Sequence, residues 1–184
     1  RSAAKTVPTG SSRNPRASPR SFPSSSAFSR RRQPRAAFPV DHFVVADTAD
    51  GTPTLVSAFF GEACHARQGA LREARLKFVA PALELLRGTA RGPARRPLRL
   101  LDACFGLGYN TFALLTEPSL ASRPVEVIGI EKERGVLDRL GLLSDVFPSW
   151  REAIARLCDT GEAVHGLHRI RVHCQPLEAL GQGK

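Results

Sequence analysis

Four residues have the types and spacing of a nucleoside-binding site. An apolar run ends in Asp102, and two glycines, Gly106 and Gly108, follow within six residues of that carboxylate. Glycines let the backbone turn sharply and let a ligand approach without a Cβ in the way. A second apolar run, Val125–Ile130, leads into Glu131. A carboxylate at the tip of such a strand can accept hydrogen bonds from both hydroxyls of a ribose, so the pattern predicts a nucleoside held between two strand ends.

The turn alone leaves the class of ligand open. Dinucleotide sites favour G-x-G-x-x-G, in which the third glycine lets the helix pack closely. Here the third position is Thr111, and an aspartate four residues before the first glycine is also unlike the dinucleotide pattern. A nucleotide-free α/β scaffold, whose glycines only turn the chain, is a further interpretation of the same residues.

The elements that position this turn are predicted to form a parallel α/β fold. Apolar runs that alternate with helical periodicity are typical of βαβ units. The predicted strands are 98–104, 125–130 and 169–174, and the predicted helices between them are 108–116, 133–143 and 149–158. Ser149 is expected to cap the last of these helices.

Three parallel strands make about half of a doubly wound sheet. The strand that carries the glycine turn is therefore expected to have one edge without a partner, and an exposed apolar edge is an aggregation hazard. The sequence also contains no methionine. Together these features suggest a truncated chain, or one that another polypeptide completes.

A β-hairpin and a helix are predicted before this sheet. Short β-prone runs at 43–47 and 54–57 flank Asp50–Gly51, a strong hairpin signal. Helical periodicity follows over 68–87, with a kink or break expected at Pro81. The residues expected to share one face of this helix are Leu71, Ala74, Phe78, Ala82 and Leu85.

The net charge of +10 comes almost entirely from one terminal segment. Residues 1–37 contain nine Arg or Lys and no acidic residue, whereas the remainder contains 18 basic and 17 acidic residues. The high isoelectric point therefore does not mark the folded part as a nucleic-acid binder. Residues 1–37 are predicted to be a disordered Ser- and Pro-rich tail, and residues 38–184 the folded domain. The tail has the composition of an organelle transit peptide, with a solvated tail or translated upstream sequence as the alternatives.

Motifs in three segments resemble the methyltransferase domain of the MnmC-type family. In order they are T-A-D-G-T-P-T-L (48–55), G-E-A-C-H-A-R-Q-G-A-L-R-E-A (61–74) and L-L-D-A-C-F-G-L-G-Y-N-T (100–111), and I-G-I-E-K-E (128–133) fits the same pattern. The resemblance covers about residues 41–180 and is closest to the stand-alone form without an FAD-dependent oxidase domain. It implies the first half of a Rossmann-like class I methyltransferase fold, S-adenosyl-L-methionine (SAM) as cofactor and tRNA as partner. The implied reaction is methylation of the aminomethyl group of a modified wobble uridine.

The resemblance also implies roles for individual residues. Those that would hold SAM are Asp102, Gly106, Gly108, Asn110, Glu131, Gln175 and Glu73. The region of His65 would line the entrance, and Tyr109 would lie near the methionine end of the cofactor. The residue itself favours a hydrogen-bonded structural histidine over a catalyst at His65, and Tyr109 can be a packing residue only. At the third strand tip, where related enzymes often place Gly-Asp, this chain has Cys174–Gln175–Pro176. The Gln175 amide can still hydrogen-bond adenine, without the charge of a carboxylate.

The family's fourth strand and the loop after it would lie beyond residue 184. The catalytic residues are therefore unknown and expected there, and the chain alone is expected to have little or no activity. An incomplete or inactive methyltransferase, and a SAM-dependent enzyme for another amine, are the alternative functions.

Other clusters carry weaker predictions. The four cysteines show no C-x-x-C spacing and no apolar run reaches 18 residues, which fits a reduced, soluble location without a membrane. A cytoplasmic location is expected, or a plastid or the mitochondrial matrix if the tail is a transit peptide.

The cluster His165, His168, His173 and Cys174 lacks the close pairs of zinc sites, so no metal is predicted. The basic loop Arg91, Arg95, Arg96 and Arg99 is either solvated or a contact for tRNA phosphate.

Overall fold

The computed structural model describes residues 42–89 and 96–181, all within one unit of the chain, Ala37–Lys184. The predicted tail, 1–37, lies outside the described residues, as do Arg91 and Arg95 of the basic loop. In the two described ranges no helix is long and apolar enough to cross a membrane.

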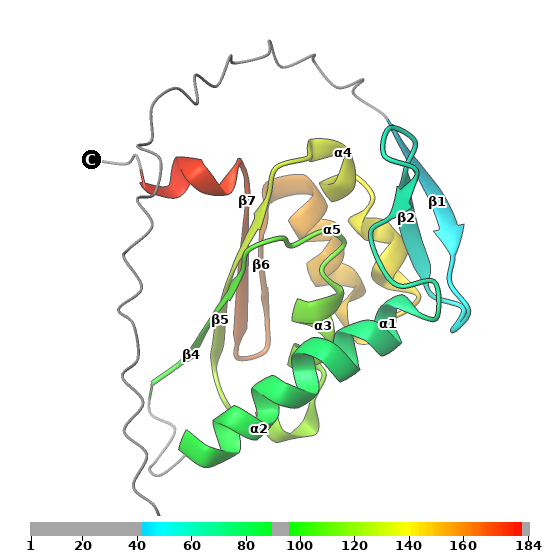
Figure 1. Ribbon diagram of the computed structural model, residues 1–184. Coiled ribbons are helices and arrows are strands. Elements are labelled where there is room, and N and C mark those ends of the chain that lie inside the picture. Colours follow the sequence, from blue (N-terminus) through cyan, green and yellow to red (C-terminus); the bar gives the residue numbers. More distant parts are fainter. Residues whose placement is uncertain (1–41, 90–95, 182–184) are drawn as a thin grey trace, which may run out of the picture. The chain divides into compact units, whose positions relative to one another are not determined.

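The described strands form two sheets (Figure 1). The first is antiparallel and consists of β1 (Phe43–Asp47), β2 (Pro53–Ser57) and the short β3 (Glu62–Ala63). The second has the order β4-β5-β7-β6, with bounds Leu98–Asp102, Val125–Glu131, His168–Cys174 and Glu162–His165. Strands β4, β5 and β7 are parallel, and β6 pairs antiparallel with β7. The predicted hairpin and the predicted parallel strands are confirmed, and β6 is an addition that no sequence pattern indicated.

One long helix joins the two sheets. It consists of α1 (Ala70–Glu73), a π-helical segment η1 (Ala74–Val79) and α2 (Ala80–Thr89). Of the expected kink or break at Pro81, the break is wrong, because the helix continues through that residue. Proline lacks an N–H and its ring crowds the carbonyl four residues earlier. The wider π turns directly before Pro81 accommodate that defect without ending the helix.

The π-helical segment also changes which side chains are buried. Ala74 and Val79, five residues apart, are buried, whereas Phe78 and Leu85 are 51% and 72% exposed. The prediction that Phe78 and Leu85 share the buried face is therefore wrong. A regular 3.6-residue period does not hold across a π turn, in which the hydrogen bonds span five residues.

The remaining helices follow the parallel strands. They are α3 (Tyr109–Leu115), α4 (Arg134–Leu137) and α5 (Arg151–Thr160), with 3₁₀ turns at Pro118–Leu120, Leu140–Ser144, Pro148–Trp150 and Leu177–Gly181. The helix predicted over 133–143 is thus two short pieces. Ser149 does not cap α5, because Pro148 starts a 3₁₀ turn that includes Ser149 and places Trp150 at the N-cap.

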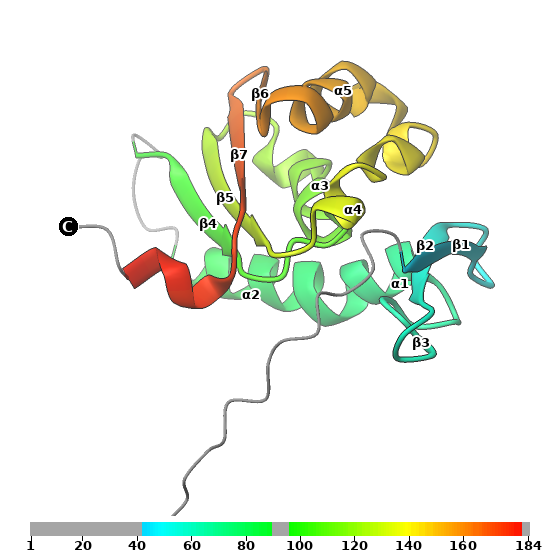
Figure 2. The same ribbon diagram turned by 90° about the horizontal axis from the view of Figure 1, so that it is seen from above.

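Helices α3, α4 and α5 lie on one side of the second sheet (Figure 2). Along β7, Ile170 and Val172 are buried and Arg169 and Arg171 are exposed, which is the alternation of a strand with one covered face. In the covered layer the ring centroid of Phe112 lies 5.6 Å from that of Phe147. This layer is the hydrophobic core of the domain.

Trp150 packs against two histidines of the cluster considered as a metal site, His165 and His168. Its ring centroid lies 4.3 Å from that of His165 and 5.8 Å from that of His168. These histidines pack against an aromatic ring at the end of the sheet. Across the described ranges, no group of three His, Cys, Asp or Glu side chains is placed to hold a metal ion.

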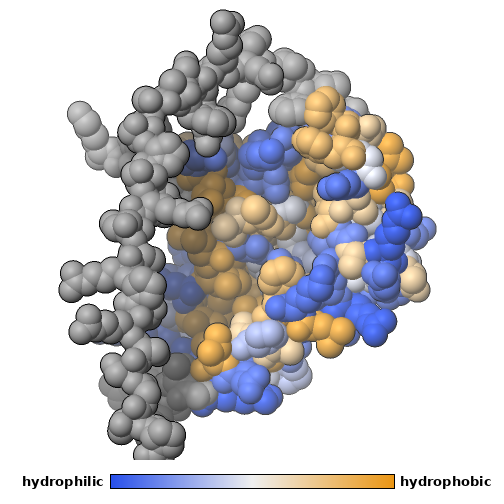
Figure 3. Space-filling model, in the orientation of Figure 1, coloured by the Kyte–Doolittle hydropathy of each residue, from blue (hydrophilic) through white to orange (hydrophobic). Residues whose placement is uncertain are grey.

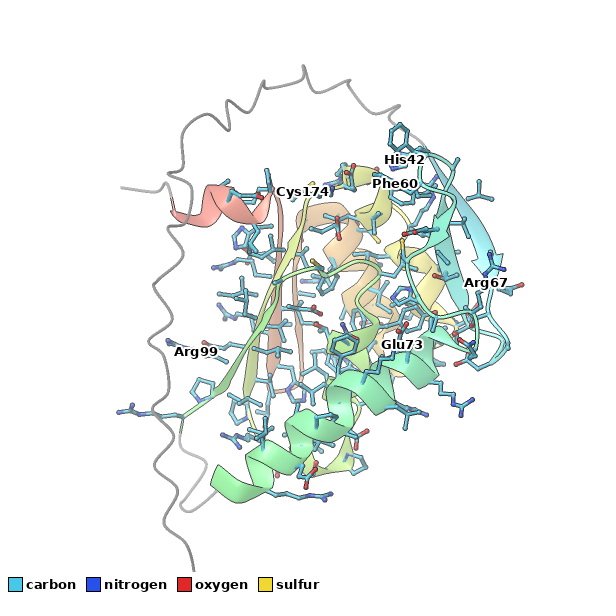
Figure 4. All side chains as sticks on the ribbon, in the orientation of Figure 1. His42, Phe60, Arg67, Glu73, Arg99 and Cys174 are labelled. Carbon is cyan, nitrogen blue, oxygen red and sulfur yellow. The ribbon has the colours of Figure 1, made fainter. Side chains whose placement is uncertain are left out.

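The opposite face of the sheet is largely open. Leu101 and Ile128 are 59% and 45% exposed there, and Arg99 extends from β4 away from the helices (Figure 4). Hydrophobic surface gathers along the sheet in the space-filling view (Figure 3). Among the described strands β4 pairs only with β5, so its other edge has no partner in this part of the chain.

Replacement of Gly129 by alanine is expected to destabilise the domain. A Cβ on Gly129, in the middle of β5, would lie 2.5 Å from a ring carbon of the buried Phe105. Such overpacking costs about 1–3 kcal/mol. Gly141→Ala is the matched control, because a Cβ there would meet nothing within 4 Å. Urea unfolding should show a lower midpoint for Gly129→Ala only, and equal midpoints for the two variants would contradict the packing described here.

Candidate functional site

Three neighbouring strand ends carry the predicted site residues. Asp102 ends β4 and Glu131 ends β5, the parallel strand beside it. On the other side of β5, Glu131 is in register with Cys174, the last residue of β7, and Gln175 follows directly. Because the carboxyl ends of parallel strands meet at one edge of a sheet, the fold brings these residues into a row, as the sequence predicted.

The glycine turn connects β4 to α3 and is tied to the end of β5. Gly106 and Gly108 have φ values of 57° and 85°, which favour glycine, and Gly108 is the N-cap of α3. The backbone N–H of Gly106 donates to Oε2 of Glu131 at 2.9 Å. The other oxygen of Glu131, Oε1, accepts from the N–H of Glu133 at 2.9 Å. The Glu131 carboxylate is thereby fixed in front of the turn.

Asp102 is buried and bonded to the first turn of α3. Its Oδ2 accepts a hydrogen bond from Oγ of Thr111 at 2.8 Å, and the Asn110 side chain also bonds to it. The pKa of Asp102 is raised to about 6, mainly by burial. The charge of Glu131 acts in the same direction as burial, and the two hydrogen bonds act against both. Thr111, which the sequence marked only as a departure from the dinucleotide motif, is thus the partner that orients this carboxylate.

A cavity of about 580 Å³ lies beside Asp102. This volume is in the range of small-molecule sites. Its walls come from the end of β4, the start of α3, the long helix and the loop after β3. Its lining residues include Asp102, Asn110, Cys104, Glu73, Val79 and His65. Asp102, Asn110 and Glu73 therefore share one cavity, whereas Glu131 and Gln175 lie at the neighbouring strand ends and are not among its lining residues.

Glu73 faces this cavity but both of its oxygens have partners within the protein. Oε2 accepts from the N–H of Ala66 at 2.6 Å, and Oε1 accepts from Nζ of Lys77 at 2.6 Å. The Lys77 hydrogen bond lowers the pKa of Glu73, and the Ala66 bond lowers it further, against the effect of burial. Glu73 therefore fixes the loop that contains Ala66, and its implied contact with the cofactor stays a prediction.

The T-A-D-G-T motif caps the long helix. Oδ2 of Asp50 accepts from the N–H of Arg72 at 3.1 Å, and Oδ1 accepts from Oγ of Thr48 at 2.7 Å and from the N–H of Thr52 at 3.1 Å. Although burial acts in the opposite direction, these hydrogen bonds hold the pKa of Asp50 below its usual value. A Cβ at Gly69 would collide with the Asp50 side chain, so the glycine before α1 is required for this cap. The motif thus joins the hairpin to the helix that lines the cavity.

Comparison with known proteins places this chain in a family. No family model matches the chain. It is 30% identical over 141 residues to the tRNA 5-methylaminomethyl-2-thiouridine biosynthesis bifunctional protein MnmC of Aromatoleum aromaticum, over 73% of this chain and 21% of that protein. The crystal structure of MnmC2 from Aquifex aeolicus matches with a TM-score of 0.57 and 31% identity, over 71% of this chain and 42% of that one. The chain is an MnmC-type methyltransferase domain.

The resemblance drawn from the motifs and the predicted fold class are both confirmed by these matches. The MnmC-type domain is also 37% identical over 75 residues to MJ0670, an uncharacterised protein of Methanocaldococcus jannaschii, over 41% of this chain and 19% of that protein. The chain spans about a fifth of the length of these two curated relatives and less than half of the solved structure.

Asp102→Asn is expected to stabilise the MnmC-type domain at pH 7.5. A carboxyl whose pKa is about 6 when folded and 3.8 when unfolded binds more protons in the folded state between those values. The free energy of unfolding therefore falls as the pH rises from about 4 to about 6. At pH 7 and above, the loss amounts to about 1–3 kcal/mol. The amide keeps an acceptor for Thr111 and has no charge to bury.

Urea unfolding at pH 4 and pH 7.5 measures this effect. The urea midpoint of Asp102→Asn should rise relative to that of the wild type as the pH rises. A difference that is the same at both values would show that the pKa of Asp102 is not raised. Asp159→Asn, on the exposed end of α5, serves as the control.

Proposed function

We propose that this domain binds SAM at the glycine turn and transfers its methyl group to the aminomethyl group of a modified wobble uridine in tRNA. The observation that carries the proposal is the Glu131 carboxylate, held at the end of β5 within hydrogen-bond distance of the Gly106 N–H. A carboxylate accepts hydrogen bonds only, which suits the two hydroxyls of a ribose. The name of the curated relative supports the choice of tRNA and of the aminomethyl group.

The residues present fit this cofactor. A Cβ built on Gly106 would meet only the Cys104 carbonyl oxygen, at 3.9 Å, so the space in front of the turn is open to a ligand. Glu131 would hold the ribose, Gln175 would hydrogen-bond the adenine, and Asn110 would lie near the methionine end, beside Asp102. SAM supplies an electrophilic methyl group on a sulfonium. The chain's own contribution is to align the two reactants and exclude water.

Glu131→Gln is expected to weaken the binding of S-adenosylhomocysteine, the product form of the cofactor, by about tenfold or more. The variant loses the charge that strengthens hydrogen bonds from the ribose hydroxyls. Its amide nitrogen also cannot accept from the N–H of Gly106 or Glu133. Glu126→Gln is the matched control, because Glu126 lies on the same strand and its carboxylate pairs with Arg99 on the open face, 3.3 Å away.

Isothermal titration of wild type and both variants measures these affinities. The control should bind like the wild type. Saturable binding of NAD with no binding of S-adenosylhomocysteine by the wild type would contradict the proposal and favour the dinucleotide interpretation of the turn.

The acceptor is tested by binding, because the chain alone is expected to have little or no activity. The wild-type chain, saturated with S-adenosylhomocysteine, is titrated with tRNA that carries the 5-aminomethyl group and with the same tRNA without that group. Tighter binding of the aminomethylated tRNA supports the proposed acceptor. Equal binding of the two tRNAs would contradict it and favour the other-amine alternative.

A further inference from the structure

His65 lies in the loop after β3 and lines the cavity together with Asp102 and Asn110. Its ring is held from two sides. Nδ1 of His65 is 2.9 Å from Oγ of Thr54, which comes from β2. The ring also meets the ring of Tyr109 edge to face, with centroids 4.9 Å apart.

The contacts that hold His65 are themselves anchored. The Tyr109 hydroxyl donates to the carbonyl oxygen of Pro53 at 2.7 Å, and burial raises the pKa of Tyr109, so this hydroxyl keeps its proton. The neighbouring residue, Ala66, donates its N–H to Glu73. The position of the imidazole is therefore set by β2, by α3 and by the long helix at once, which is the support that a preorganised group requires.

The second ring nitrogen of His65 has no partner in the described part of the chain. Since Nδ1 is occupied by Thr54, Nε2 is the nitrogen left to meet a ligand in the cavity. A histidine in a cavity wall, with one nitrogen oriented by a hydrogen bond and the other left without a partner, can act as an acid–base group.

The surroundings of His65 favour the neutral ring. Burial lowers its pKa, and the nearby charge of Glu73 opposes that effect in part. The other titratable groups around it are Tyr109, which is protonated, and Cys64, Cys104 and Asp102 on the cavity wall. Burial raises the pKa of the Cys64 thiol, so this group also stays neutral near pH 7. The imidazole thus keeps a lone pair at neutral pH.

We propose that Nε2 of His65 contacts the acceptor amine, accepts a hydrogen bond from its ammonium form and takes one of its protons. The inference rests on the proposed function and assigns the group that makes the amine nucleophilic. In the required tautomer, Nδ1–H donates to Oγ of Thr54. The freed lone pair forms the new N–C bond, while the C–S bond breaks and its electron pair stays on sulfur. The sulfonium becomes a neutral thioether, the product is a secondary ammonium, and the proton on His65 passes to solvent.

Two variants of His65 distinguish a direct contact with the amine from a structural role in the cavity wall. His65→Asn keeps a polar atom near the position of Nδ1, for the bond to Thr54, and removes Nε2. His65→Gln places a polar acceptor near the position of Nε2. His173→Asn is the control, because His173 is on β7 and is not among the residues that line the cavity. Circular dichroism and thermal unfolding of all variants check that each one folds.

The readout is binding to the protein saturated with S-adenosylhomocysteine. Two nucleosides are titrated, 5-aminomethyluridine and 5-methyluridine, which differ only in the amine. The wild type and His173→Asn should prefer the amine by about tenfold or more, as a hydrogen bond to a charged group would give. His65→Asn should lose this preference to within about twofold, His65→Gln should regain part of it, and the affinity for S-adenosylhomocysteine should stay the same in all.

The pH dependence provides an independent check. Protonated imidazole repels an ammonium group, so the wild-type preference should disappear as the pH falls through the pKa of His65, which NMR titration of the ring should place below the ordinary histidine value of 6.5. A preference that persists in His65→Asn, or is absent from the wild type, would overturn the inference. A wild type that binds no S-adenosylhomocysteine would instead overturn the proposed function on which it rests.

Discussion

The close approach of one aromatic ring to two glycines determines the geometry of this domain. The buried ring of Phe105 lies where a Cβ of Gly129 or Gly108 would have to be, at 2.5 and 2.8 Å from the nearest ring carbons. The backbone N–H of Phe105 also donates to the carbonyl oxygen of Ile130 at 3.0 Å. Phe105 therefore fixes the distance between the glycine turn and the end of β5. The next residue of β5, Glu131, can reach the Gly106 N–H only because this spacing is fixed, so the candidate ribose contact depends on a glycine in the middle of a strand.

The two carboxylates of the site differ in environment although they end neighbouring strands. Glu131 is half-buried, and its two oxygens accept hydrogen bonds from two backbone N–H groups. Asp102 is buried against side chains of α3, and burial raises its pKa to about 6. A buried carboxylate with a raised pKa destabilises the folded state at neutral pH, and such arrangements cluster at functional sites. The pair thus combines one carboxylate held by the backbone with one whose ionisation opposes folding.

Sequence patterns predicted the parts of the fold that have strong local signals. The hairpin around Asp50–Gly51, the glycine turn and the three parallel strands follow from residue types within a few positions. The π-helical segment does not follow from local residue types. It forms because the helix must accommodate Pro81 and at the same time stay packed on α3 through Ala74 and Val79. Strand β6 has no apolar run, and its pairing with β7 is a tertiary contact. In the site, Asp102, Glu131 and Gln175 lie together at one sheet edge as predicted, but the bonds from Thr111 to Asp102 and from Ala66 to Glu73 depend on packing between elements.

The hairpin and the long helix explain why the motifs before the sheet are more specific than the glycine turn. A turn of this kind suits any nucleoside, because it offers backbone and a carboxylate. The polar side chains of the earlier motifs instead bond to one another and to backbone: Asp50 to the start of α1, Thr54 to His65, and Glu73 to the loop beside His65. None of these bonds is needed to build the parallel sheet. Their common effect is to fix one wall of the cavity beside Asp102, so the residues of this wall are under a geometric constraint that the fold by itself does not impose.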